Sequence, residues 1–133
     1  MKILIVDDEK YLRELLSEVL QSHSHECETA GDGEEALVKL EQERFDVVIT
    51  DAMMPRMDGF TLLKNIKKTY PETAVVVITG YSIAYSARDA MAIGAEEYLA
   101  KPFHTEEILS VVDKAYRLKG GGDAAGRKNL TTA

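Results

Sequence analysis

The amino-acid sequence predicts an α/β fold in which a doubly wound parallel sheet of five strands is covered by five helices. The first observation is that short apolar runs alternate five times with segments of helical periodicity. This order is typical of a parallel sheet with helices on both faces. The second observation is that the runs VVIT at 47–50 and AVVVIT at 74–79 are rich in β-branched residues and lack polar alternation. Strands of this composition are covered on both faces.

The first half of the chain predicts two strands and two helices. An apolar run at 3–6 predicts the first strand, and a weaker run at 27–30 predicts the second. The helix between them has an apolar stripe at i, i+3, i+4, i+7 and i+8. That stripe consists of Leu12, Leu15, Leu16, Val19 and Leu20. The second helix is predicted from Ala36, Leu37 and Leu40.

The second half repeats this order three times. Strands are predicted at 47–50, 74–79 and 98–100. The helix after the first of these has its stripe at Phe60, Leu63 and Ile66, and the last helix has its stripe at Ile108, Val111, Val112 and Ala115. The helix predicted at 83–93 has a weak apolar stripe, because that stripe is built on alanines and Met91.

Composition restricts the class of protein. The 133 residues are 45% hydrophobic and 29% charged, with a formal net charge of −7. This excess of acidic groups argues against direct nucleic-acid binding, and no run approaches the ~20 apolar residues of a membrane span. Cys27 is the only cysteine, which excludes an internal disulfide and favours the cytoplasm. Because a strand pattern follows Met1 directly, no signal peptide is expected.

The chain is predicted to form one domain over residues 1–119. Residues 120–133 read GGGDAAGRKNLTTA and have no apolar period. We interpret them as a flexible tail or the start of a linker.

Polar side chains stand where the predicted strands end. Asp7 and Asp8 follow the first strand, Asp51 follows the third, Thr79 closes the fourth and Lys101 follows the fifth. Ligand sites of open parallel sheets lie at the carboxyl ends of the strands. We therefore expect these five side chains to form one site.

The charges indicate what this site binds. Three carboxylates and one lysine leave a net charge of −2, which one divalent cation cancels. Mg²⁺ prefers oxygen ligands and completes its coordination with water and phosphate oxygens. A cation beside a lysine and a hydroxyl favours a phosphoryl group, which a free carboxylate can attack. The alternative for Asp7 and Asp8 is that they cap the first helix.

Four motifs resemble the receiver domain of two-component response regulators. They are VDDE at 6–9, DVVITDAMMPRMDG at 46–59, VVVITGY at 75–81 and GAEEYLAKPF at 94–103. The resemblance covers residues 2–118 and is specific because the motifs occur in order and at the right spacing. It implies a flavodoxin-like (CheY-like) sheet of order 2-1-3-4-5.

The resemblance also implies the chemistry. Asp51 would accept a phosphoryl group from a sensor histidine kinase or a histidine phosphotransfer protein. Asp8 would bind Mg²⁺ directly and Asp7 mainly through water, with Asp51 and the backbone carbonyl of Met53 as further ligands.

Other residues are assigned to phosphoryl recognition and switching. Lys101 would pair with the phosphoryl oxygens and Thr79 would hydrogen-bond to them. Tyr98 matches the aromatic residue that turns inward as Thr79 moves toward the phosphate. The bond between Lys101 and Pro102 matches a cis peptide. Pro55, Asp58 and Gly59 are interpreted as turn and cap residues.

The expected function is a phosphorelay switch that catalyses only its own phosphorylation and dephosphorylation. Output to an effector domain or protein is expected through the fourth helix, fifth strand and fifth helix, with the chain a monomer or a phosphorylation-dependent dimer. The last two helices look slightly more like receivers of NtrC-type activators, and the chain is either a stand-alone receiver or part of a longer regulator.

Two other functions are less compatible with the sequence. A Mg²⁺-dependent phosphatase with an aspartyl-phosphate intermediate generally carries a second aspartate two residues after the nucleophile, where this chain has Met53. A flavin-binding module needs a phosphate-cradling loop after the first strand. The residues there are DDEK, which repel phosphate without a metal.

Overall fold

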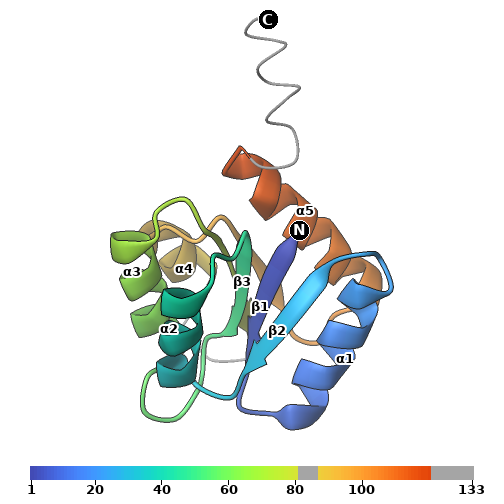
Figure 1. The fold of residues 1–133 in the computed structure, drawn as a ribbon, viewed down its shortest axis with the longest axis horizontal. Coiled ribbons are helices and arrows are strands. Elements are labelled where there is room, and N and C mark those ends of the chain that lie inside the picture. The colour runs from blue at the N-terminus through green and yellow to red at the C-terminus, as the bar shows by residue number, and fades with distance from the viewer. Residues whose placement is uncertain (81–86, 121–133) are drawn as a thin grey trace, which may run out of the picture.

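The computed structural model describes residues 1–80 and 87–120, and it confirms the predicted α/β fold (Figure 1). Strands and helices alternate along the whole described chain. The elements are β1 Lys2–Val6, α1 Lys10–Gln21, β2 Glu26–Ala30, α2 Gly33–Gln42, β3 Val47–Asp51, α3 Gly59–Thr69, β4 Ala74–Thr79, α4 Ala87–Ile93, β5 Glu97–Ala100 and α5 Thr105–Leu118.

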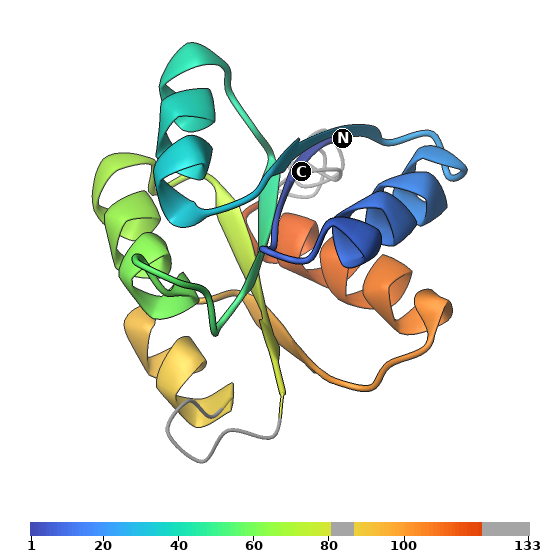
Figure 2. The same cartoon turned by 90° about the horizontal axis from the view of Figure 1, so that it is seen from below.

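The five strands form one parallel sheet in the order β2-β1-β3-β4-β5, as the resemblance implies. The register places the carboxyl ends of the strands side by side. Val6 pairs with Ala30 on one side and with Thr50 on the other. This edge of the sheet lies at the bottom of Figure 1 and faces the viewer in Figure 2.

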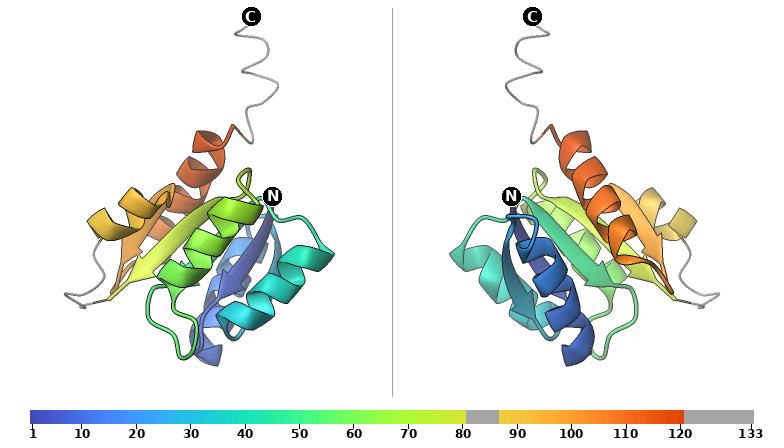
Figure 3. Two further views of the ribbon diagram at one scale, coloured as in Figure 1. Left: turned by 90° about the vertical axis from the view of Figure 1, so that its left-hand side faces the viewer. Right: turned by 90° about the vertical axis from the view of Figure 1, so that its right-hand side faces the viewer.

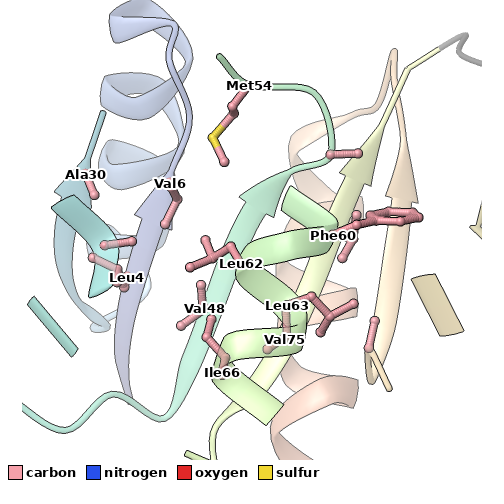
Figure 4. Close-up of a cluster of buried hydrophobic side chains, with 14 of the residues drawn as sticks. Leu4, Val6, Ala30, Val48, Met54, Phe60, Leu62, Leu63, Ile66 and Val75 are labelled. Atoms are coloured by element: carbon pink, nitrogen blue, oxygen red, sulfur yellow. The ribbon is translucent and has the colours of Figure 1, made fainter. Parts of the chain in front are cut away.

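Helices cover both faces of the sheet. α1 and α5 lie on one face, and α2, α3 and α4 lie on the other (Figures 2 and 3). Two apolar clusters fill the two layers, and Figure 4 shows part of the cluster between the sheet and α2, α3 and α4. Every residue of β3 and β4 is buried, which confirms that these strands are covered on both faces.

Helix caps explain why the helices are longer than their predicted stripes. The Asp32 carboxylate accepts a hydrogen bond from the Glu35 N–H at the start of α2, at 2.8 Å. Asp58 accepts one from the Thr61 N–H at the start of α3, also at 2.8 Å. A capping aspartate satisfies a free amide of the first turn, so the helix begins next to the cap rather than at the first apolar residue.

Two predicted segments extend beyond the described residues. The helix predicted at 83–93 is observed from Ala87, and residues 83–86 lie outside the described part of the chain. Residues 121–133, which make up nearly all of the predicted tail, also lie outside it. Among the described helices, none is long and apolar enough to cross a membrane.

Candidate functional site

Three aspartates come together at the carboxyl edge of the sheet. Asp7 and Asp8 follow β1, and Asp51 is the last residue of β3. One carboxylate oxygen of each lies within 4.8 Å of the others. Asp7 and Asp51 are buried and Asp8 is exposed, so the cluster opens to solvent on the Asp8 side.

All polar groups of Asp7 except one carboxylate oxygen have hydrogen-bond partners. Its N–H donates to the Ala30 carbonyl at 3.2 Å, and its own carbonyl accepts from Arg13 Nη1 at 2.7 Å. Asp7 Oδ1 accepts from the Glu9 N–H at 2.8 Å. Asp7 Oδ2 is buried without a hydrogen-bond partner in the described part of the chain. Buried polar atoms are rarely unpaired, so this oxygen is suited to ligating a cation.

The electrostatic environment of Asp7 also favours a bound cation. Burial, and to a lesser extent the neighbouring charges of Asp51 and Asp8, raise the pKa of this carboxyl group from 3.8 to about 6. The Glu9 N–H and the Lys101 ammonium act in the opposite direction. A divalent cation in the cluster would remove the repulsion that disfavours the ionised form.

Asp51 is held by partners on both of its oxygens. Its Oδ2 accepts a hydrogen bond from Lys101 Nζ at 3.2 Å, and its Oδ1 accepts one from the Met53 N–H at 3.2 Å. The backbone N–H of Lys101 donates to the Thr79 carbonyl at 2.7 Å. The ammonium of Lys101 is therefore anchored beside the buried Thr79 while its tip reaches Asp51.

The remaining predicted residues lie around this centre. The peptide bond between Lys101 and Pro102 is cis. Tyr98 lies on β5 with 42% of its surface exposed, so its ring points outward in this structure. Met53 is 50% exposed and follows the last residue of β3 by two positions.

Gly59 is more than a turn residue, because the backbone of Asp51 leaves no room for a side chain at this position. A Cβ atom on Gly59 would lie 2.1 Å from the backbone oxygen of Asp51. Any side chain there would displace the strand end that carries Asp51. The sequence shows a glycine after a capping aspartate, but only the packing of α3 against β3 reveals this contact.

Sequence reasoning also missed Arg13 and the groove next to the site. Arg13 belongs to α1 and restrains the turn that carries Asp7 and Asp8. An apolar groove of about 490 Å³ lies between α1 and the segment that follows β5. Leu12, Leu15, Lys101, Pro102 and Phe103 are among its lining residues. The groove combines residues that are distant in sequence, so no local pattern indicates it.

Comparisons with known proteins agree with this geometry. Residues 3–113 match the family model of the response regulator receiver domain. The chain is 41% identical over 111 residues to the response regulator protein FleR of Pseudomonas aeruginosa, which covers 84% of this chain and 24% of that protein. It is 33% identical over 132 residues to the response regulator MprA of Mycolicibacterium vanbaalenii, covering 99% of this chain and 57% of that protein. The chain thus spans between about a quarter and somewhat over half of these relatives.

A solved structure shares the fold along nearly its whole length. It is a response regulator receiver domain protein from Clostridium thermocellum, with a TM-score of 0.84 and 35% sequence identity. The match covers 90% of this chain and 96% of that chain.

Proposed function

Because the chain belongs to the response regulator receiver domain family of two-component systems, we propose that it accepts a phosphoryl group on Asp51. The donor is a phosphohistidine of a sensor histidine kinase or a histidine phosphotransfer protein. The observation that carries the proposal is the cluster of Asp7, Asp8 and Asp51 with the Lys101 ammonium on Asp51. This arrangement combines a nucleophile, a cation site and a fixed positive charge.

The residues at the site fit a magnesium ion. Asp7, Asp8, Asp51 and the Met53 carbonyl would hold it, Asp7 mainly through water. Asp7 Oδ2 has no hydrogen-bond partner among the described residues, so it can accept a hydrogen bond from such a water. A bound Mg²⁺ supplies charge neutralisation for the phosphoryl oxygens. Four oxygens from two neighbouring strand ends are a hard-ligand set of the kind that Mg²⁺ prefers.

The transfer exchanges one bond to phosphorus for another. An Asp51 oxygen attacks phosphorus, the phosphorus–nitrogen bond of the phosphohistidine breaks, and the imidazole leaves with the electron pair. Lys101 already lies at Asp51 and moves its hydrogen bonds to the phosphoryl oxygens as their charge approaches. The Thr79 hydroxyl, at the end of the adjacent strand β4, donates a further hydrogen bond.

The chain acts as a switch and not as an enzyme on outside substrates: it catalyses only its own phosphorylation and dephosphorylation. As Thr79 turns toward the phosphoryl group, the exposed ring of Tyr98 turns inward. Output passes through the surface of α4, β5 and α5 to an effector domain or protein, and the chain is a monomer or dimerises on phosphorylation.

Exposed apolar side chains support this output surface. Met91 of α4, Tyr98 of β5 and Leu118 of α5 are large hydrophobic residues, one exposed on each of the three elements of this surface. Exposed aromatic and methionine side chains are enriched at protein–protein contacts. We place the switch in the cytoplasm, with protein partners rather than nucleic acid or membrane.

The phosphodonor approaches over the groove beside α1. Lys101 belongs both to the groove and to the site, so a partner whose histidine reaches Asp51 must cover this region. Tyr11 stands at the rim with 77% of its surface exposed. An exposed aromatic residue next to an apolar groove is suited to anchor a protein partner.

Mass spectrometry of the intact chain tests the proposal. With Mg²⁺ and a small-molecule phosphodonor, we expect the mass to rise by one phosphoryl group, and Asp51→Asn to prevent the rise. Removing Mg²⁺ with a chelator should slow the reaction strongly. A phosphorylated Asp51→Asn variant, or a label on a histidine, would contradict the assignment.

A further inference from the structure

The segment 52–58, between β3 and α3, carries the Met53 carbonyl that is assigned to the metal. Both sides of this carbonyl are anchored. The Gly59 N–H donates to the Ala52 carbonyl at 3.0 Å. The next side chain, Met54, is buried in the apolar cluster between the sheet and the helices (Figure 4). These contacts hold the residues on either side of the Met53 carbonyl. For the carbonyl to keep its direction, residues 55–58, which lead from Met54 to α3, must be held as well.

The second half of the segment contacts the start of α2. Arg56 Nη2 donates to Asp32 Oδ2 at 2.6 Å, while Asp32 Oδ1 caps α2 through the Glu35 N–H. Arg56 has a φ of +68°, a conformation that is unfavourable for a residue with a side chain. Met57 packs so closely on Gly33 that a Cβ there would lie 2.7 Å from Met57 Sδ. Two consecutive residues of the segment thus contact two consecutive residues at the start of α2, its cap Asp32 and its first residue Gly33.

We infer that Asp32 and Arg56 are positioning residues that hold the segment 52–58 so that the Met53 carbonyl faces the Asp7, Asp8 and Asp51 cluster. This inference rests on the proposed function, because it concerns the same Mg²⁺ site. Asp32 is a fixed anchor, since its other oxygen is committed to the helix cap. The pair restrains Arg56 in a conformation that the backbone alone disfavours.

The expected effect is modest and measurable. Arg56 is 64% and Asp32 is 24% exposed in their side chains, and such pairs contribute up to about 1 kcal/mol. Loss of the pair should therefore weaken Mg²⁺ binding about twofold to fivefold.

Two substitutions distinguish a positioning role of these residues from a purely electrostatic effect of their charges on Mg²⁺ binding. Arg56→Gly removes the side chain and tolerates the positive φ. Asp32→Asn removes the charge and keeps an oxygen for the α2 cap. If the residues act only through their charges, Arg56→Gly strengthens Mg²⁺ binding and Asp32→Asn weakens it. If they act by positioning, both weaken it, and the double variant is no weaker than the single ones.

Calorimetric titration of the whole chain with Mg²⁺, without phosphodonor, measures this affinity. The matched control is Asp113→Asn, which removes an exposed ion pair with Arg117 on α5 and should leave the affinity unchanged. Weakened binding in both single variants, with the metal-free melting temperature lowered by no more than a few degrees, supports the inference. Opposite changes, unchanged affinities or additive losses in the double variant overturn it. A wild-type chain without measurable Mg²⁺ binding would instead overturn the proposed metal site itself.

Discussion

Lys101 spans the carboxyl edge of the sheet to Asp51, and its Nζ donates a hydrogen bond to Asp51 Oδ2 at 3.2 Å. The two residues lie on segments that β4 separates in the sheet. The backbone hydrogen bond from Lys101 to Thr79 fixes the base of the lysine. Its ammonium can therefore pass from Asp51 to incoming phosphoryl oxygens by rotation of the side chain alone.

Mg²⁺ should stabilise the fold, because it relieves the repulsion among Asp7, Asp8 and Asp51 and binds only the native state. We expect the melting temperature to rise with Mg²⁺ concentration. Asp8→Ala should raise the stability of the metal-free chain and abolish the response to Mg²⁺. Thermal unfolding with increasing MgCl₂ measures both effects, and an equal response of wild type and Asp8→Ala would place the metal elsewhere.

Stability without metal should depend on pH through Asp7. The pKa of Asp7 is raised from 3.8 to about 6 in the folded chain, so the folded state binds this proton more tightly than the unfolded state. The stabilisation of the folded state by protonation of Asp7 is fully present below pH 4 and is lost as the pH rises through about 6. It amounts to at most about 3 kcal/mol, since one pKa unit corresponds to about 1.4 kcal/mol.

Urea unfolding in chelator between pH 4 and pH 7.5 tests this expectation. Asp7→Asn keeps an oxygen for the Glu9 N–H and cannot ionise. The loss of stability that deprotonation of Asp7 causes in this pH range should therefore disappear in the variant. The same profile in both chains would show that another group causes it.

Tyr11→Ala should slow phosphoryl transfer from a histidine kinase that phosphorylates this chain. We expect a decrease of about tenfold in kcat/KM, because exposed aromatic anchors contribute on the order of 1–2 kcal/mol to protein contacts. Phosphorylation by a small donor such as acetyl phosphate should not change. Val38→Ala on α2, which also removes an exposed apolar side chain, is the matched control. Equal slowing with both donors would assign Tyr11 to the chemistry rather than to docking.

Lys67 and Glu96 should stabilise the end of the sheet opposite the site. Lys67 Nζ lies 2.7 Å from both Glu96 carboxylate oxygens, and Glu96 Oε1 also accepts the Val75 N–H at 2.7 Å. Burial lowers the pKa of Lys67, so the pair is partly desolvated. Lys67→Met should cost about 2 kcal/mol of unfolding free energy. Among the described residues it leaves the Glu96 carboxylate with the more distant Lys119 as its cationic partner.

Urea denaturation measures this loss. Adding Glu96→Gln should recover part of it, since the amide oxygen keeps the Val75 hydrogen bond without a charge. Lys10→Met, which removes an exposed pair with Glu14, should change the stability by less than about 0.5 kcal/mol. Equal losses in Lys67→Met and Lys10→Met would show that the half-buried pair contributes no more to stability than an exposed one.

The aspartyl phosphate should be long-lived. Hydrolysis requires a water aligned behind phosphorus, and the half-exposed Met53 cannot donate a hydrogen bond to orient it. Met53→Asn should speed dephosphorylation several-fold, whereas Met91→Asn on α4 should not. The decay of the phosphorylated mass after removal of the donor measures the lifetime in wild type and in both variants. Equal lifetimes of wild type and Met53→Asn would show that this side chain does not control the water.

The sequence alone determined the fold class and the composition of the site. Apolar periodicity distinguishes strands from helices, and parallel strands bring their carboxyl ends to one edge. Asp7, Asp8, Asp51, Thr79 and Lys101 could therefore be assigned to one place before any coordinates. The strand order followed from the motifs rather than from periodicity, which carries no information on which strands are neighbours.

Only the tertiary structure determined how these groups are held. Arg13 on the Asp7 carbonyl, Arg56 on Asp32 and Lys67 on Glu96 join ordinary charged residues from distant segments. Nothing local distinguishes such residues from others on a solvated surface, because a long-range pair is selected by packing of the elements that carry it. The same reason applies to the close approach of Gly59 to Asp51 and to the unpaired Asp7 Oδ2. Composition and spacing predict which side chains meet, but the distances and burial that set their chemistry arise only when the helices pack on the sheet.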